Sequence, residues 1–190
     1  MGTGKTDVSV KIQNIVASAS IGEAIDLKAV SRAFPEAKYE PEAFLGLVLH
    51  LEEPKTTSLL FRSGKMICAG AKSARDIEEA ISKTLRRLKD KGIIILLEKP
   101  KSEIINVVAS ASLGGNIDLE KAAYVLGRII YEPDQFPGAI YRMDDPKVVV
   151  LIFASGKFVI VGAKREEEPT RAARRLREIL VENGLIYLDG

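Results

Sequence analysis

The sequence contains one cysteine and one histidine among its 190 residues, and each scarcity excludes a kind of site. A single cysteine, Cys68, cannot form an internal disulfide, which fits a reducing, cytoplasmic compartment. The single histidine, His50, has no cluster of cysteines or carboxylates at metal-ligand spacing, and no serine–histidine–aspartate set can be assembled around it. We therefore expect no metal, no cofactor and no nucleophilic catalysis.

Long apolar runs and a strong charge imbalance are also missing. No run of eighteen apolar residues exists, so we expect no transmembrane helix and no membrane partner. Residues 1–7 lack the apolar core of a signal peptide. The formal net charge is only +2, so composition alone does not indicate a nucleic-acid-binding protein. Nucleic-acid binding would have to come from the placement of charges or from apolar contact.

The chain contains two copies of one sequence unit. Residues 14–20 read NIVASAS, and residues 106–112, 92 positions later, read NVVASAS. Placing residues 8–98 on residues 100–190 without a gap gives 31 identical positions of 91. We therefore predict a tandem duplication with repeats at 8–99 and 100–190. The same offset matches Tyr39-Glu40-Pro41 with Tyr131-Glu132-Pro133, Ser63-Gly64-Lys65 with Ser155-Gly156-Lys157, and Gly70-Ala71-Lys72 with Gly162-Ala163-Lys164.

Each repeat predicts the same order of elements, β-α-β-β-β-β-α. In the first repeat we expect strands at 8–20, 44–51, 57–63 and 65–71, with 39–41 as a turn or short edge strand. Asp26 is expected to cap a short helix that Pro35 ends, and Ser73 to cap a helix that Gly92 ends. Residues 93–97 are expected to connect the repeats. In the second repeat Asp118 is the expected cap, residues 114–116 a turn, and 170–182 the last helix.

Short turns between successive strands predict an antiparallel sheet, so the fold class is α+β. We expect the two copies to continue one another as a single saddle-shaped or sandwich-like sheet. Helices on one side of such a sheet should leave polar residues on the other, but the second face here is apolar. It carries Asn14, Val16, Phe44, Val48, Leu59, Phe61, Ile67 and Ala69 in the first repeat, and Asn106, Val108, Phe136, Ile140, Leu151, Phe153, Val159 and Val161 in the second.

Two interpretations of this face are open. The two repeats could pack face to face and bury it, or it could be an exposed platform for an apolar partner. Asn14 and Asn106 favour the exposed platform, because buried amides in a dry core need hydrogen-bond partners. Basic residues border the face in matched pairs, which suits the apolar sugar walls and flanking phosphates of a DNA minor groove. The pairs are Lys55 with Lys147, Lys65 with Lys157, Lys72 with Lys164, and His50 with Arg142.

The paired motifs resemble the TATA-binding protein family, over nearly the whole chain from Val8 to about Glu182. The short amino-terminal arm is similar to that of archaeal members. The resemblance implies a saddle-shaped antiparallel sheet with its helices on the convex face. It also implies a general transcription initiation factor, of a family known for minor-groove binding, inserted apolar wedges and sharp DNA bending.

The resemblance assigns roles to individual residues. Phenylalanine pairs insert between base steps, and central amides donate to minor-groove acceptors, where a guanine amino group would clash. Other positions lie on the groove floor or near the sugar-phosphate backbone. The wedges are Phe44, Phe61, Phe136 and Phe153, with Pro137 beside them; the amides are Asn14 and Asn106; the floor is Val16, Leu59, Ile67, Ala69, Val108, Leu151, Val159 and Val161; and the backbone contacts are Ser63, Lys65, Lys72, Arg142, Ser155, Lys157 and Lys164.

The resemblance also implies partners. Glu132, Asp134 and Gln135 match the loop that contacts transcription factor B, which in turn recruits RNA polymerase. We expect a monomer on double-stranded TATA-box DNA, with dimerisation of the free protein left open, in the cytoplasm and nucleoid of an archaeon or the nucleus of a eukaryote. The arginines of the last helix, Arg171, Arg174, Arg175 and Arg177, are interpreted as a solvated face or, alternatively, a polymerase- or DNA-facing patch. The alternative for the whole chain is a duplicated small-molecule-binding or enzymatic domain with a cleft between the halves.

Overall fold

A computed structural model describes residues 8–94 and 100–188. The chain divides into two compact units, one made of residues 14–105 and the other of the segments 1–13 and 106–190. The cuts fall inside the first strand of each sequence repeat, so each unit consists mainly of one repeat. The predicted amino-terminal arm at 1–7 and most of the predicted connector at 93–97 lie outside the described residues.

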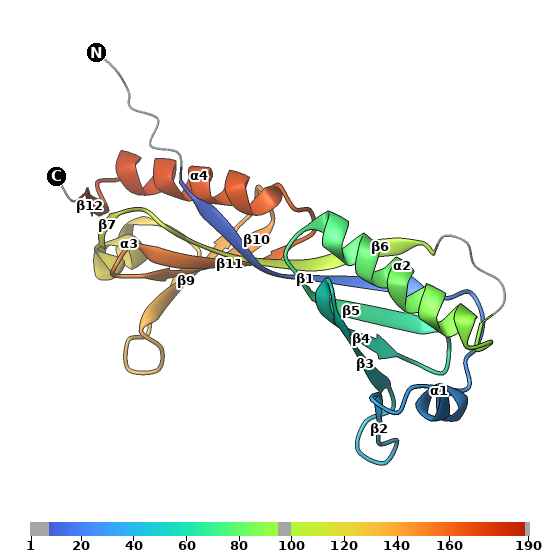
Figure 1. Cartoon of the computed structure of the whole chain (residues 1–190). Helices are drawn as coiled ribbons and strands as arrows, with labels where there is room; N and C mark the ends of the chain where they lie inside the picture. The colour runs from blue at the N-terminus through green and yellow to red at the C-terminus, as the bar shows by residue number, and fades with distance from the viewer. Residues whose placement is uncertain (1–7, 95–99, 189–190) are drawn as a thin grey trace. The chain divides into compact units, whose positions relative to one another are not determined.

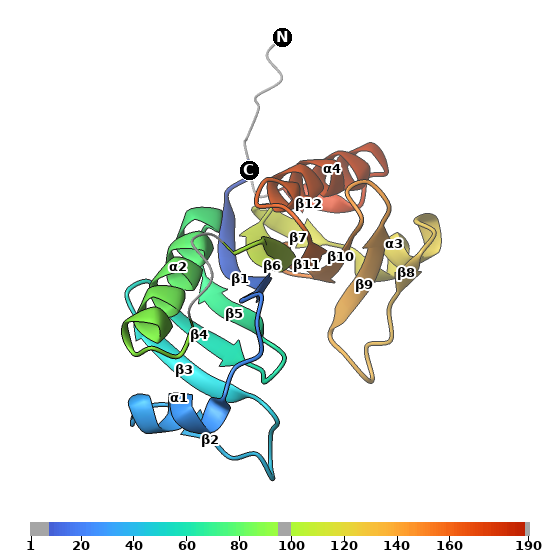
Figure 2. The same cartoon turned by 90° about the vertical axis from the view of Figure 1, so that its right-hand side faces the viewer.

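The first repeat folds into five antiparallel strands and two helices. In chain order they are β1 (Val10–Ser20), α1 (Leu27–Ala33), β2 (Lys38–Tyr39), β3 (Leu47–Glu52), β4 (Lys55–Leu60), β5 (Lys65–Ala71) and α2 (Ala74–Asp90). Hydrogen-bonded neighbours follow the order β2-β3-β4-β5-β1. Helix α2 packs against β4 and β5, and α1 lies beside β2 (Figure 2). The long helix therefore covers one face of this sheet.

The second repeat has the same plan with one addition. Its elements are β6 (Ser102–Ser112), β7 (Gly115–Ile117), α3 (Leu119–Val125), β8 (Ile129–Ile130), β9 (Gly138–Met143), β10 (Val148–Phe153), β11 (Lys157–Ala163), α4 (Glu168–Glu182) and β12 (Ile186–Leu188). The strand order is β6-β11-β10-β9-β8, and α4 packs on β11 (Figure 1). The addition is a small two-stranded sheet of β7 and β12.

The helices begin where local capping chemistry predicts. The Asp26 carboxylate accepts hydrogen bonds from the backbone N–H groups of Lys28 and Ala29, and Asp118 accepts one from Lys121. The Ser73 hydroxyl accepts from the Asp76 N–H. These bonds satisfy N–H groups that have no partner within a helix. All three predicted caps are confirmed.

The core forms where α2 and α4 meet the inward faces of the strands. Ile77, Ile81 and Leu88 of α2 are buried, and so is Cys68 of β5. Burial raises the pKa of the Cys68 thiol, an effect that hydrogen bonds with Ser58 and Thr56 only partly offset. Cys68 is therefore a small buried residue of the core.

The hairpin turns at Gly64 and Gly156 are positions where only glycine fits. Gly64 has a φ of +84°, and a Cβ there would lie 2.0 Å from the backbone oxygen of Glu23. Gly156 has a φ of +79° and would meet the oxygen of Gly115 at the same distance. The turn at Gly64 joins the antiparallel strands β4 and β5, and close backbone approach adds a second reason for the glycine besides its positive φ.

Several predicted boundaries are wrong. The strand predicted at 57–63 runs from Lys55 to Leu60, because the residues after it form the hairpin turn. The strand predicted from Phe44 starts at Leu47, because the residues before it form the loop that carries the Phe44 ring. The predicted turn at 114–116 is mostly strand β7, which pairs with β12. The last helix starts at Glu168, two residues before the predicted position. Within the described ranges, no helix combines the length and hydropathy needed to cross a bilayer.

Candidate nucleic-acid interface

The face of each sheet opposite its long helix is apolar and partly open. In β4, β5, β10 and β11, inward residues such as Leu60, Met66 and Ile152 are buried, while the residues that alternate with them are half-buried. We call this half-buried face, in each repeat, the platform. It consists of Asn14, Val16, Phe44, Val48, Leu59, Phe61, Ile67 and Ala69 in the first repeat, and of Asn106, Val108, Phe136, Ile140, Leu151, Phe153, Val159 and Val161 in the second.

Strand register places the platform side chains in continuous rows. Leu59 of β4 lies between Val48 of β3 and Ile67 of β5, and Ala69 pairs with Val16 of β1. The second repeat has the corresponding rows, in which Leu151 lies between Ile140 and Val159. Within each repeat the structure therefore brings the predicted floor residues together on one surface.

A pair of phenylalanine rings closes one end of each platform. Phe44 and Phe61 meet edge to face, with ring centroids 5.9 Å apart and an interplanar angle of 71°. Phe136 and Phe153 repeat the arrangement at 5.8 Å and 63°. Phe44 and Phe136 remain 42% and 36% exposed, which is unusual for rings that could be buried. Each pair therefore presents a preformed apolar wedge.

Glycines below the rings make room for this arrangement. A Cβ on Gly46 would lie 2.6 Å from Phe44 Cε1 and 3.1 Å from Phe61 Cε1. A Cβ on Gly138 would lie 2.8 Å from Phe136 Cε1 and 3.0 Å from the nearest Phe153 atom. Both rings of a pair therefore rest against a glycine backbone. The sequence interpretation gave these glycines no role, although the repeated Phe-x-Gly spacing was a signal that could have found them.

The two loops that carry the exposed rings are built alike. The backbone oxygen of Glu40 accepts hydrogen bonds from the N–H groups of Ala43 and Phe44, and that of Glu132 accepts from Gln135 and Phe136. Each loop projects from the end of its sheet, away from the long helix of its own repeat (Figure 1). Their side chains are exposed, including those predicted to contact a partner protein: Glu132, Asp134 and Gln135, with Pro137 next to Phe136.

Each platform carries one amide, and its orientation is fixed by the backbone. The N–H of Gly70 donates to Asn14 Oδ1 with an N···O distance of 2.7 Å. The N–H of Gly162 donates to Asn106 Oδ1 at 2.8 Å. Only the oxygen of an amide can accept from an N–H, so the NH₂ group must occupy the other side of each side chain. The amides thus keep two hydrogen-bond donors that the glycine N–H does not use.

Basic and hydroxyl side chains surround each platform. The predicted backbone contacts are all exposed: Ser63, Lys65, Lys72, Arg142, Ser155, Lys157 and Lys164. Lys55, Lys147 and His50 are also exposed, and His50 Nδ1 lies 2.9 Å from the Thr57 hydroxyl. Exposed cations can reach phosphates and release the counterions condensed on them, so this rim suits a polyanion.

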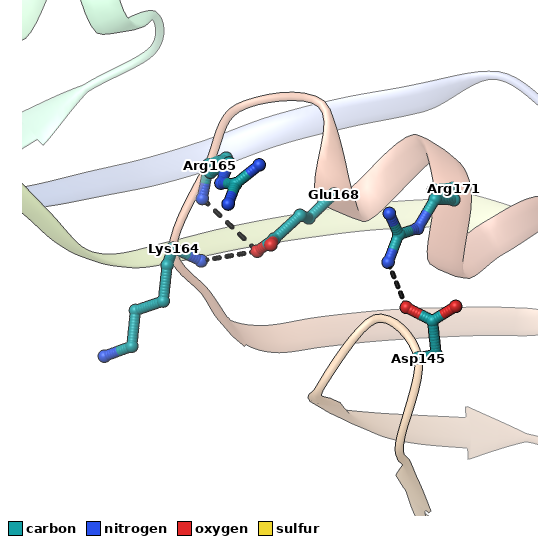
Figure 3. Close-up of polar contacts among 5 residues, drawn as sticks. All are labelled: Asp145, Lys164, Arg165, Glu168 and Arg171. Atoms are coloured by element: carbon teal, nitrogen blue, oxygen red, sulfur yellow. Dashed lines mark hydrogen bonds and ion pairs between the residues drawn. The ribbon is translucent and has the colours of Figure 1, made fainter.

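Glu168 shapes the end of this rim in the second repeat. Its carboxylate accepts hydrogen bonds from the backbone N–H groups of Lys164, at 2.8 Å, and Arg165, at 3.3 Å. Figure 3 shows that the side chain of Lys164 extends away from this carboxylate. The acidic residue therefore holds the backbone between β11 and α4 while the lysine amine points elsewhere.

The arginine run of α4 is largely engaged with its own repeat. Arg171 forms an ion pair with Asp145 of the turn between β9 and β10 (Figure 3), and Arg175 forms one with Glu178 at 3.2 Å. Arg174 is exposed. These contacts favour the solvated-face interpretation of the run. Across the described residues, no group of three or more potential metal ligands comes together.

Comparisons with known proteins point to one family. The family model described as "Transcription factor TFIID (or TATA-binding protein, TBP)" matches residues 9–91 and again 101–183. The TATA-box-binding protein of Sulfolobus acidocaldarius is 49% identical over 173 residues, covering 91% of this chain and 87% of the relative. That of Archaeoglobus fulgidus is 46% identical over 182 residues, covering 95% and 99%.

A solved structure gives the same result for the fold. Methanococcus jannaschii TBP is similar with a TM-score of 0.83 and 49% sequence identity, covering 92% of this chain and 99% of that one. The predicted fold class, a duplicated α+β unit with an antiparallel sheet, is confirmed. Two family matches in tandem and relatives at nearly half identity over almost the full length leave one conclusion: the chain belongs to the TATA-binding protein family.

Proposed function

We propose that this chain is a general transcription initiation factor that binds the minor groove of a TATA-box element and bends it. The observation that carries the proposal is the platform in each repeat, apolar in its middle, cationic around its rim and closed by an exposed ring pair. The family is one of transcription factors, so the enzymatic alternative is set aside and the chain is not an enzyme.

The chemistry of the minor groove matches each part of the platform. Its sugar walls are apolar and suit Val, Leu and Ile side chains, while its phosphates lie outside and suit the lysines. A·T pairs present only acceptors in this groove, which suits the donor NH₂ groups of Asn14 and Asn106. The repeats at 8–99 and 100–190 would each read one half of a nearly two-fold symmetric element.

The ring pairs supply the bending. Opening a base step costs a few kcal/mol in lost stacking, and a flat apolar ring can replace part of that contact where a charged side chain could not. Phe44 with Phe61, and Phe136 with Phe153, are already assembled in the protein without DNA. Because the wedges are preformed, little ordering cost is added at the moment of binding.

Fluorescence anisotropy tests the proposal directly. A TATA duplex should bind more tightly than a duplex with G·C pairs in the element, and Phe44→Ala together with Phe153→Ala should weaken binding. Tyr124→Ala is the matched control, because Tyr124 is an aromatic residue of α3 that is 94% exposed and lies outside the platform. Equal affinity for both duplexes, or no binding at any salt concentration, would refute the proposal.

We also propose that the loop with Glu132, Asp134 and Gln135 recruits transcription factor B, and through it RNA polymerase. The two repeats are nearly equivalent, so the direction of transcription must depend on loops that differ and on the partner. Asp134→Lys should abolish the ternary complex in a gel-shift assay without changing DNA affinity. Glu42→Lys, the equivalent exposed position of the first loop, should leave it intact. Equal effects of the two substitutions would contradict this assignment.

The proposed setting follows from the proposed function. A factor that acts on promoters works in the cytoplasm and nucleoid of an archaeon or in the nucleus of a eukaryote. It acts as a monomer on DNA, since one chain already contains both platforms.

A further inference from the structure

Each repeat contains a β-bulge next to its platform asparagine. In β5, Ala69 pairs with Val16 and Ala71 with Ile15, so Gly70 has no partner of its own in β1. In β11 the register shifts in the same way between Ile160 and Ala163. The two bulge glycines, Gly70 and Gly162, have φ values of +100° and +87°. This conformation, which residues with a Cβ rarely adopt, frees the glycine N–H from the strand ladder.

The freed N–H acts as a clamp on the amide. It donates to Asn14 Oδ1 in one repeat and to Asn106 Oδ1 in the other, at 2.7 and 2.8 Å. Rotating an amide by half a turn would set its NH₂ against the glycine N–H, placing two donors together and leaving both unpaired. That arrangement is unfavourable for partly buried groups. The bulge therefore allows one orientation of the amide.

We infer that Gly70 and Gly162 are specificity-determining residues, which hold Asn14 and Asn106 with their donor side toward the groove and so exclude base pairs that carry a minor-groove amino group. The inference rests on the proposed minor-groove function and adds a cause for its base preference. An unclamped amide could turn over and accept a hydrogen bond from the guanine amino group. A clamped amide has only N–H groups to offer, and guanine meets it donor to donor.

A comparison of the two repeats supports a joint role for the platform asparagine and the bulge glycine. Several residues beside the asparagine and the glycine differ between repeats: Ile15 corresponds to Val107, and Ala69 to Val161. The asparagine, the glycine, the bulge and the hydrogen bond are the same in both. Any acceptor, including a serine or an aspartate, could satisfy the bulge N–H. An asparagine satisfies it and also supplies donors on its other side.

The test uses a TATA duplex in which 2-aminoadenine replaces adenine at the central base pairs. This base adds the minor-groove amino group while keeping an A·T-type pair, and an inosine–cytosine duplex provides the converse probe, because it lacks that group. The unmodified protein should bind the 2-aminoadenine duplex about tenfold more weakly than the plain duplex. It should tolerate inosine–cytosine much better than guanine–cytosine.

Gly162→Ala should reduce the penalty for 2-aminoadenine to about threefold or less. A Cβ there meets no atom within 4 Å, so the strain comes from the positive φ alone, and we expect alanine to relieve it by shifting the bulge and its N–H. Gly114→Ala is the matched control: its φ is +67°, a Cβ there also meets nothing within 4 Å, and it lies outside the platform. This control should keep the full tenfold penalty.

Asn106→Asp tests the same idea without disturbing the bulge. Aspartate keeps an oxygen for the Gly162 N–H and turns a second oxygen, an acceptor, toward the groove. The 2-aminoadenine duplex should then bind as well as the plain duplex or better. Repulsion between the carboxylate and DNA lowers both affinities alike, so it cancels in their ratio. Thermal unfolding of each variant confirms that it is folded before binding is measured.

The outcomes separate this inference from the proposed function. Failure of the unmodified protein to prefer a TATA duplex defeats the proposed function itself. A TATA preference without a 2-aminoadenine penalty overturns the inference alone. A penalty that stays tenfold in Gly162→Ala or in Asn106→Asp also overturns it, since the bulge would then have only a structural role.

Discussion

Gly46 offers a sharp test of the idea that the ring pair works as a preformed wedge. In the structure, a Cβ at this position would lie 2.6 Å from Phe44 Cε1 and 3.1 Å from Phe61 Cε1. Ordinary contact starts at about 3.4 Å, so the Phe44 edge must retreat by about 0.8 Å and the Phe61 edge by about 0.3 Å. The nearest atoms around the new methyl group all belong to these two rings.

The cost of Gly46→Ala should fall on DNA binding more than on folding. Phe44 is partly exposed and can turn aside, at a strain of about 0.5 to 1.5 kcal/mol for a ring moved off its rotamer. A displaced wedge replaces less of the lost base stacking, and we expect a loss of about 1 to 2 kcal/mol in binding. This corresponds to a Kd about 5 to 30 times higher.

Anisotropy titration with a TATA duplex measures this effect, and thermal unfolding measures the change in stability. Gly127→Ala is the matched control, because a Cβ on Gly127 meets no atom within 4 Å and needs no left-handed backbone. Gly46→Ala should bind more weakly than this control but more tightly than Phe44→Ala. If Gly46→Ala binds as tightly as Gly127→Ala, the position of the ring is not set by the glycine and the reasoning fails.

Three further predictions concern the rim, the hairpin and the core. Lys65→Ala should reduce the slope of log K against log salt by about one unit, and an unchanged slope removes Lys65 from the phosphate contacts. Gly64→Ala should lower the free energy of unfolding by about 3 kcal/mol or more, because its Cβ would collide with a backbone oxygen 2.0 Å away. Gly184→Ala, with a φ of +59° and open space, should cost only about 1 kcal/mol in the same denaturant titration. Because burial raises its pKa, the Cys68 thiol should react with a disulfide reagent only after unfolding; reaction of the native protein at the rate of a free thiol would contradict this.

The features that the sequence predicted well depend on local chemistry. Asp26, Ser73 and Asp118 cap helices because a side-chain oxygen next to free N–H groups suffices, wherever the helix lies in the fold. The platform was predictable for a similar reason, since the face of a strand residue follows from its parity along the chain. The position of a residue along a strand gives its face but not its role, so the roles of individual residues came from the family resemblance.

The features that the sequence missed depend on geometry between separate segments. The bulge at Gly70 exists only relative to the register of β1, and its hydrogen bond to Asn14 spans 56 residues. Strand β7 was predicted as a turn because three residues carry little pattern, and its partner β12 lies about seventy positions later in the chain. Apolar alternation extended a predicted strand to Phe44, where the loop instead turns the ring outward.

The half-buried, apolar platform of each repeat has a thermodynamic consequence. Water leaves this surface when a groove covers it, and removing apolar surface from water lowers the heat capacity. The enthalpy of complex formation should therefore become more favourable with each degree of warming and change sign within an accessible range. Calorimetry at several temperatures would show this as a negative slope. Because the protein would contact DNA through Val, Leu, Ile and Phe side chains, its own apolar surface would make the enthalpy of promoter binding depend on temperature.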